Sequence, residues 1–267
     1  MTLCCLLLFT QPPIFHEDFE SGSLAAWGDN RGNLRIVEEG AYKGKRCLEV
    51  TANPGKGAGG HIVRWFLPGY DEVWVRWAVK FAPDFDQGNH MHLCALAGNR
   101  VDDKWSAFGK AGKKPTGTDF FVTNLEPWRD WGRNEPPGVL MLYSYWPDMQ
   151  RSRDGMYWGN NLLSNPPLMV PRGKWTVWTL WMKLNEPGKA NGEQAFWMDG
   201  KPGGRWKGMR FRDTLDLRLN SLSLDLYIHD SKQVNRVWFD EVEIGVGTPT
   251  LMGVNRQAAA DAMQSTG

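Results

Sequence analysis

The sequence has little of what marks the most easily recognised classes of protein. Its 31 Lys and Arg residues are matched by 30 Asp and Glu residues, which leaves a formal net charge of +1. Nucleic-acid binders usually carry a clear basic excess, so we expect no nucleic-acid partner. The apolar run at residues 2–9 is far shorter than the roughly 20 residues that a membrane-spanning helix needs. We interpret residues 1–14 as the remnant of a signal segment, which predicts a secreted or periplasmic protein.

Cysteine is also scarce, with four in 267 residues. Cys4 and Cys5 lie in the N-terminal apolar run, whereas Cys47 and Cys94 lie in separate predicted strands. The last two are either buried thiols or a disulfide, because spacing alone does not decide between these states. No spacing of His and Cys residues is typical of a zinc site.

Segments with helical periodicity are few, whereas stretches with two-residue alternation, rich in β-branched and aromatic residues, recur along the chain. Turn sequences, such as residues 53–60, separate them. The predicted strands are residues 15–19, 34–40, 46–53, 60–68, 72–83, 89–98, 120–128, 139–146, 175–184, 193–200, 221–230 and 236–245. This pattern predicts an all-β fold, an antiparallel β-sandwich or jelly roll. We expect one domain over residues 15–247 and a C-terminal tail, helical or disordered, at residues 248–267.

Two segments, residues 99–117 and 147–173, are too long for tight hairpins, and a third interruption lies at residues 127–138. Long loops on a rigid β scaffold often carry binding residues. The Arg, Lys, Trp and Asn content of the two longer loops suits a polar, anionic ligand, with plain solvated loops as the alternative. The sequence also has 15 Trp residues, and any on an open surface would suit stacking on sugar rings.

Pairs of polar side chains share one face in three of the predicted strands, because side chains alternate between the two faces of a sheet. These pairs are Tyr143 and Tyr145, His90 and His92, and Asn124 and Glu126. Neighbouring strands lie about 4.8 Å apart, so three such rows on one concave face would converge on a single sugar. Further polar candidates on other strands are Arg64, Arg76 and His229.

The order of motifs along the chain resembles a known group of proteins. The motifs are VWVRWAVKFAPDFD, HLCALAGN, WTVWTLWMKLNEPGKANGEQAFWMDGK, MRFRD and VWFDEVEIG. They are similar to the polysaccharide lyases with a concanavalin-like β-jelly roll, particularly the alginate lyase family 14 type, with the family 20 glucuronan lyases and their fungal cellulose-induced relatives close by. The resemblance covers roughly residues 15–247. It implies a concanavalin/LamG-like jelly roll that cleaves a uronic-acid-containing glycan by β-elimination.

The resemblance also implies positions for the family's site residues. Tyr143 and Tyr145 match its Tyr-x-Tyr strand, and His92 falls at the lysine of its KLPGL motif. Thr123 and Leu125 take the positions of its Ser-x-Arg strand, so this sequence has a leucine where the family has an arginine.

Elimination from a uronate needs a base for the C–H proton, an acid for the departing oxygen and donors that neutralise the substrate carboxylate. Histidine suits the base because its unperturbed pKa of roughly 6.5 lies near neutrality. Tyrosine suits the acid or the base. We therefore predict His92, His90, Tyr143 and Tyr145 as catalytic residues, and Asn124, Glu126, Arg64, Arg76 and His229 as substrate-binding residues.

Two other functions stay open. The chain is a non-catalytic carbohydrate-binding protein if the aromatic residues only stack on sugars. It is a glycoside hydrolase if Glu126 works with Asp119, Asp148 or Asp225. The Glu-x-Asp-x-x-Glu motif of laminarinase-like hydrolases is absent, so elimination ranks above hydrolysis. For the lyase we expect an anionic polysaccharide as partner and a monomeric state.

Carboxylates near both ends of the domain indicate a structural cation. Alternation turns Asp18, Glu20 and Asp240 outward, and the first and last strands of jelly rolls often pair. Oxygen ligands of this kind suit Ca²⁺. The resemblance to the fungal relatives assigns this calcium to Glu20 and Asp240. The alternative is an edge that acidic residues keep soluble.

Overall fold

The chain folds into two antiparallel sheets packed face to face, in a computed structural model that describes residues 12–38 and 40–250. No helix occurs in this described part of the chain. The predicted all-β sandwich is therefore confirmed. Most of the predicted signal segment, at residues 1–11, and most of the predicted tail, at residues 251–267, lie outside the described residues.

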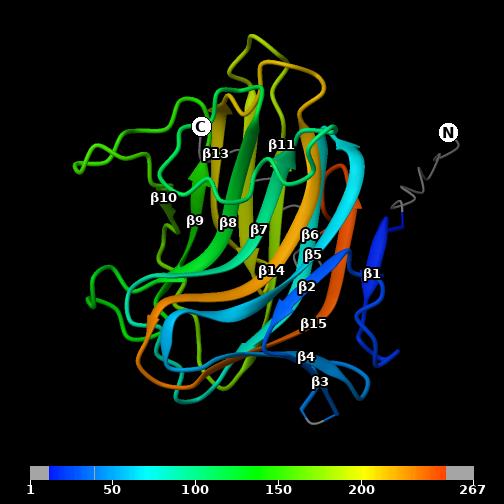
Figure 1. The fold of residues 1–267 in the computed structure, drawn as a ribbon, viewed down its shortest axis with the longest axis vertical. Coiled ribbons are helices and arrows are strands. Elements are labelled where there is room, and N and C mark those ends of the chain that lie inside the picture. The colour runs from blue at the N-terminus through cyan, green and yellow to red at the C-terminus, as the bar shows by residue number, and fades with distance from the viewer. Residues whose placement is uncertain (1–11, 39, 251–267) are drawn as a thin grey trace, which may run out of the picture.

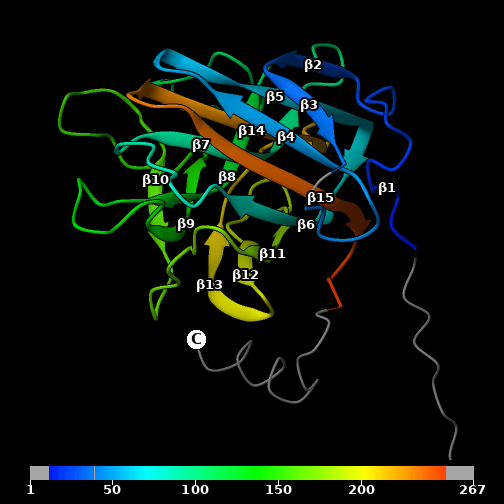
Figure 2. The same cartoon turned by 90° about the horizontal axis from the view of Figure 1, so that it is seen from below.

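One sheet, here called sheet A, has the order β13-β12-β11-β6-β15-β4-β3, and β1 pairs with β15. Figure 2 shows β13 and β12 at the end of this sheet far from β3 and β4. Its strands are β1 (Phe15–Glu17), β3 (Leu34–Val37), β4 (Cys47–Ala52), β6 (Glu72–Phe81), β11 (Trp175–Lys183), β12 (Gly192–Met198), β13 (Lys201–Met209) and β15 (Asn235–Val246). The pairing of β1 with β15 joins the first and last strands, as expected from the sequence.

The other sheet, sheet B, has the order β10-β9-β8-β7-β14-β5-β2 (Figure 1). Its strands are β2 (Asp29–Gly32), β5 (Gly55–Tyr70), β7 (Met91–Asn99), β8 (Phe120–Trp128), β9 (Val139–Tyr145), β10 (Asn160–Leu163) and β14 (Arg218–Ser231). Strand β14 lies between β7 and β5, so segments distant in the sequence become neighbours.

The predicted strand set is incomplete at four places. β2, β10 and β13 were not predicted, because β2 and β10 are short and the Gly- and Pro-containing start of β13 matches a turn. Residues 53–60, predicted as a turn, instead open the 16-residue strand β5 from Gly55 onward. Glycine there allows close approach to β14, since a Cβ on Gly59 would lie 1.5 Å from the Leu226 carbonyl oxygen.

The main core fills the space between the two sheets with side chains from the inward face of each strand. Trp77 of β6 and Trp178 of β11 are fully buried there, with ring centroids 5.9 Å apart. Cys47 and Cys94 are buried free thiols, one in each sheet, so the disulfide alternative is wrong. Burial raises the pKa of Cys47 to about 11, which keeps this thiol protonated.

A polar network crosses this core and joins the two sheets. The Thr123 hydroxyl of β8 donates to Gln194 Oε1 of β12 at 2.8 Å, and Gln194 Nε2 donates to the Ser144 hydroxyl of β9 at 3.2 Å. All three residues have no exposed surface. Because buried polar groups need partners, the network fixes β8 and β9 relative to sheet A.

We predict that Gln194→Ala lowers the free energy of unfolding by about 2–3 kcal/mol, since it leaves the buried Thr123 and Ser144 hydroxyls without their amide partner. Urea denaturation measures this loss. Gln150→Ala is the matched control on an exposed side chain and should change stability by less than about 0.5 kcal/mol. Equal stability of the two variants would contradict a structural role for the network.

Candidate functional site

The outward face of sheet B gathers the polar rows that the sequence predicted in three strands. In β9, Tyr143 and Tyr145 face outward, whereas Leu142 packs in the main core. Asn124 of β8 lies directly opposite Tyr143 in the strand register. The face is therefore set by simple alternation in both strands.

Strand β7 departs from alternation near its start, and this departure positions His92. Leu93 and Cys94 are both buried in the main core, whereas His92 and Ala95 face the same outward pocket. The register between β7 and β14 shifts at this point, between Leu224 and Tyr227. Such irregularities redirect side chains next to functional sites.

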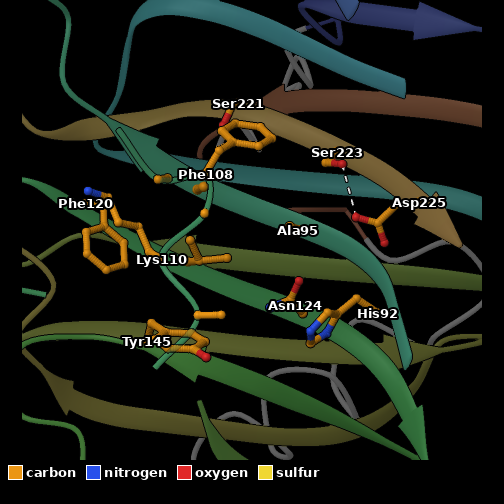
Figure 3. A pocket seen from close by; sticks show the side chains of 15 residues that line it. His92, Ala95, Phe108, Lys110, Phe120, Asn124, Tyr145, Ser221, Ser223 and Asp225 are labelled. Carbon is orange, nitrogen blue, oxygen red and sulfur yellow. Dashed lines mark hydrogen bonds between the residues drawn. The ribbon is translucent and has the colours of Figure 1, made fainter. Parts of the chain in front are cut away.

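A pocket of about 230 Å³ lies on this face of sheet B (Figure 3). Its floor comes from β7, β8, β9 and β14, and one wall comes from the predicted binding loop at residues 99–117. Figure 3 shows His92 and Asp225 at one end and Phe120 and Lys110 at the other. Tyr145 extends its hydroxyl toward the His92 end.

His92 forms an ion-pair contact with a buried carboxylate. Its Nδ1 lies 2.8 Å from Glu126 Oε2, and Glu126 is only 2% exposed. Burial alone would lower the pKa of His92, but the charge and hydrogen bond of Glu126, together with the charge of Asp225, outweigh it and raise the pKa above its ordinary value. His92 Nε2 has no hydrogen-bond partner among the described residues, so one ring nitrogen is held while the other is available.

The two tyrosines contact each other beside this pair. Their hydroxyl oxygens lie 3.3 Å apart, and the Tyr143 ring centroid lies 5.4 Å from that of His92. Burial, reinforced by the Tyr145 hydroxyl, raises the pKa of Tyr143. Gly159 covers the Tyr143 ring so closely that a Cβ there would lie 2.5 Å from a ring carbon. Tyr145, and not Tyr143, is the tyrosine that lines the pocket.

Further aromatic groups surround His92. The Tyr227 ring of β14 stacks on it at 5.7 Å, with an interplanar angle of 19°. His90 lies 4.9 Å from His92 and 5.9 Å from His229 between ring centroids. Partial burial and the nearby His92 and His229 lower the pKa of His90 to about 4, so His90 is neutral at neutral pH. His229 is exposed and contacts the site only at this margin.

Asp225 adds a second acidic group at the His92 end. The Ser223 hydroxyl is 3.3 Å from Asp225 Oδ2, but Asp225 Oδ1 is buried with no partner among the described residues (Figure 3). Burial raises the pKa of Asp225. An unpaired acceptor of this kind is suited to a hydroxyl donor from a ligand.

Five sequence-based placements need correction. Arg76 lies on β6 of sheet A, where it contacts Thr179 and Glu243, far from the pocket sheet. Arg64 lies on β5 of sheet B but reaches the Ala26 carbonyl and the Phe15 ring, so it does not line the pocket.

The other three corrections concern residues of β8. Thr123 and Leu125 face the core, so neither can occupy the substrate-facing Ser and Arg positions assigned to them. Glu126 faces the outward side but lies beneath His92 and does not line the pocket. The sequence could not show that Thr123 and Leu125 face the core, because alternation defines two faces of a strand without showing which one meets solvent.

The carboxylates considered for hydrolysis do not assemble around Glu126. Asp148 pairs with Arg210, and Asp119 accepts N–H groups of Thr116 and Phe120. Of these three aspartates, Asp225 alone lines the pocket that His92 also lines. A nearly buried Glu126 held by His92 is poorly placed to act on a glycosidic bond.

Glu20 and Asp240 serve as anchors for the backbone at residues 42–46. Glu20 Oε1 accepts the N–H groups of Lys45 and Arg46, and Asp240 Oδ2 accepts those of Tyr42 and Lys43. Within the described residues no group of three or more His, Cys, Asp or Glu is arranged to hold a metal. A calcium ion at Glu20 and Asp240 stays a prediction of the resemblance alone.

Several pocket residues were not singled out from the sequence. They include Ala95, Ala97, Lys110, Ser221 and Ser223. The alternating small residues of HLCALAG were the available signal for a hollow floor, and the long loop was the signal for Lys110. None of the 15 Trp residues lines the pocket, so the stacking surface expected from tryptophan is not found there.

No protein-family model matches the sequence, and no curated protein matches it either. Several solved structures do match this chain. An alginate lyase from Aplysia kurodai superimposes with a TM-score of 0.70 at 16% identity, over 89% of this chain and 100% of that one. An endo-β-1,4-glucuronan lyase from the fungus Trichoderma reesei gives 0.59 at 20% identity, over 88% and 96%. A variant of alginate lyase Aly36B bound to alginate trisaccharide gives 0.65 at 13% identity, over 89% and 99%.

These similarities confirm the resemblance at the level of the fold. The chain has the β-sandwich jelly roll found in alginate and glucuronan lyases. Identities of this size define the architecture and leave the chemistry to be argued from the site itself.

We predict that Glu126→Gln lowers the pKa of His92, because the variant removes the negative charge that raises it. An NMR titration of the His92 ring protons measures this shift. Glu193→Gln, which alters a carboxylate paired with Arg205 in sheet A, is the control and should leave the His92 titration unchanged. An unaltered His92 pKa in Glu126→Gln would mean that the carboxylate does not set the charge of the ring.

Proposed function

We propose that this chain is a polysaccharide lyase that cleaves a uronic-acid-containing glycan by β-elimination. The observation that carries the proposal is His92, which is paired with the buried Glu126 and lines, together with Tyr145, an open pocket of sheet B. An oriented imidazole and a phenol are the base and acid that elimination requires. The similar lyases named above support this choice of chemistry. An extracellular location and a monomeric state belong to the same proposal.

His92 acts as the base. In its neutral form the Nδ1–H donates to Glu126, which leaves the Nε2 lone pair free. The carboxylate raises the pKa of the ring, which makes Nε2 a stronger base, and it fixes the tautomer. Glu126 is thus a positioning residue that acts through His92.

The substrate carboxylate takes up charge as the C–H bond breaks, so it needs hydrogen-bond donors. Asn124 supplies one at the His92 end of the pocket. Its Nδ2 donates to the Tyr143 carbonyl at 3.2 Å, which orients the amide and leaves its second hydrogen available.

Tyr145 acts as the acid. The C–H proton passes to His92 Nε2, the electrons of that bond form the C=C bond, and the C–O bond breaks with its electron pair going to oxygen. That oxygen takes the Tyr145 proton, and the phenolate is reprotonated from the imidazolium or from water. The Tyr143 hydroxyl, 3.3 Å away, stabilises the transient Tyr145 phenolate.

Non-catalytic carbohydrate binding is the second candidate. The absence of any arginine among the pocket-lining residues favours it, because only His92 and Lys110 offer positive charge there. Incubation with alginate, glucuronan and related polymers separates the candidates. Elimination gives unsaturated uronates that absorb in the ultraviolet, hydrolysis gives reducing ends without that absorbance, and binding alone gives neither.

We predict that His92→Ala and Tyr145→Phe each reduce the rate of ultraviolet product formation by about 10²–10⁴-fold, the usual contribution of a general acid or base. His16→Ala and Tyr70→Phe are the matched controls, since both residues lie on the surface outside the pocket. Thermal unfolding should be similar in all four variants. Full activity in both pocket variants would remove the catalytic assignment.

The pH profile gives a separate prediction. His92 must be unprotonated to act as base, so kcat/KM should rise with pH through the pKa of His92. Glu126→Gln lowers that pKa, and the rising limb should then move to lower pH while the plateau falls. A plateau that falls with no movement of the limb would show that another group is the base.

A further inference from the structure

The pocket changes in chemical character along its length. The His92 end carries Asn124 and Asp225, whereas the remainder is mostly apolar. The apolar residues are Ala95, Ala97, Ala107, Phe108, Phe120 and Val122. The site therefore offers two environments to one bound chain.

The apolar part has room for a second sugar next to the one at His92. Phe120 and Asn124 face the same side of β8 four residues apart, a span of about 13 Å at strand spacing. Ala95 and Ala97 of β7 form the low floor of this part. On the neighbouring strand β14, Ser223 lies opposite Ala95 and Ser221 lies opposite Ala97. Hydroxyl groups thus line one side of this part, and Val122 and Phe120 line the other.

The loop wall over the apolar part is fixed in place. The Ala107 N–H donates to Asn99 Oδ1 at 2.9 Å, and the Ser106 hydroxyl donates to the Asp119 carbonyl at 2.9 Å. Asn99 itself is fully buried between Asn220 and Ser221. A wall held by buried hydrogen bonds selects a ligand by shape, because little ordering is left for binding.

A cation lies beyond the apolar part. Lys110 Nζ is 5.6 Å from the Phe120 ring centroid and has no carboxylate partner within the described residues. Its aliphatic stem covers the apolar end while the ammonium remains available. A negative group on the ligand would be favoured at this position.

From these contacts we infer that the glycan is a heteropolymer in which the sugar beside the reacting uronate carries a methyl group, and in which a second anionic group follows at Lys110. The methyl group belongs to a 6-deoxy sugar or to an O-acetyl substituent. On the side lined by Val122 and Phe120, across from the serine hydroxyls, a carboxylate of the ligand would lose its water and find no side-chain donor before Lys110. A methyl group bound there contributes favourable binding free energy, because its apolar surface is removed from water. This inference rests on the proposed function, since it concerns the same site.

Calorimetric binding to His92→Ala, with a matched pair of ligands, tests the inference. The pair is O-acetylated polyglucuronate and the same polymer after deacetylation, and an alternating polymer of glucuronate and 6-deoxyhexose is the third ligand. A methyl-bearing ligand should bind at least about fourfold more tightly than the deacetylated polymer, the gain expected from burying one methyl group. The acetylated and 6-deoxy arms separate the two sources of the methyl group.

Two variants locate the effect in the structure. Val122→Thr keeps the side-chain shape but places a hydroxyl in the apolar part, and it should reduce the preference for methyl-bearing ligands. Lys110→Gln should weaken binding of every anionic polymer and reduce its salt dependence, whereas Lys174→Gln, on an exposed residue outside the pocket, should not.

Equal or tighter binding of the deacetylated polymer, or no binding of any of the three, would overturn the inference. The proposed function fails separately, when the wild-type protein forms no unsaturated product from any polymer. The measured binding preference decides the inference whether or not the protein forms unsaturated product, because binding does not depend on turnover.

Discussion

The contact between His92 and Glu126 is the constraint around which the site is built. A carboxylate with almost no exposed surface is unfavourable unless a partner compensates its charge, and here the partner is an imidazole 2.8 Å away. The contact holds one nitrogen of the ring and leaves the other facing a pocket. The stacked Tyr227 and the adjacent Tyr143 restrict the ring further. One buried charge thus determines the orientation, tautomer and basicity of the residue proposed to react.

Buried hydrogen bonds in the core of the sandwich hold the strands of the site in place. Between the two tyrosines, Ser144 turns inward and joins Thr123 and Gln194, so the outward row of β9 stands on a hydrogen-bonded layer that reaches sheet A. The same strands therefore carry the core on one face and the chemistry on the other. A site on paired strands is held more rigidly than one on loops, which suits acid–base chemistry that depends on short distances.

The fold is similar to that of alginate and glucuronan lyases at identities of 16% and 20%, so a similar architecture is built from largely different residues. The pocket of this chain has a lining of its own chemical character. Its lining includes no arginine, Lys110 is its basic side chain besides the imidazole of His92, and much of the rest is alanine, valine and phenylalanine. These features are more consistent with a glycan of mixed polarity than with a polymer that bears a carboxylate on every sugar.

Strand alternation was enough to predict the fold class and to place Tyr143 and Tyr145 on one face, because a two-residue period is visible in the order of residues along the chain. It could not say which sheet a strand joins, so Arg76 was placed with residues that lie in the other sheet. It could not fix which face of β8 meets solvent, nor the irregularity that turns His92 outward while Leu93 and Cys94 stay buried. Those outcomes depend on strand order and on packing between distant segments, and only the tertiary structure decides them.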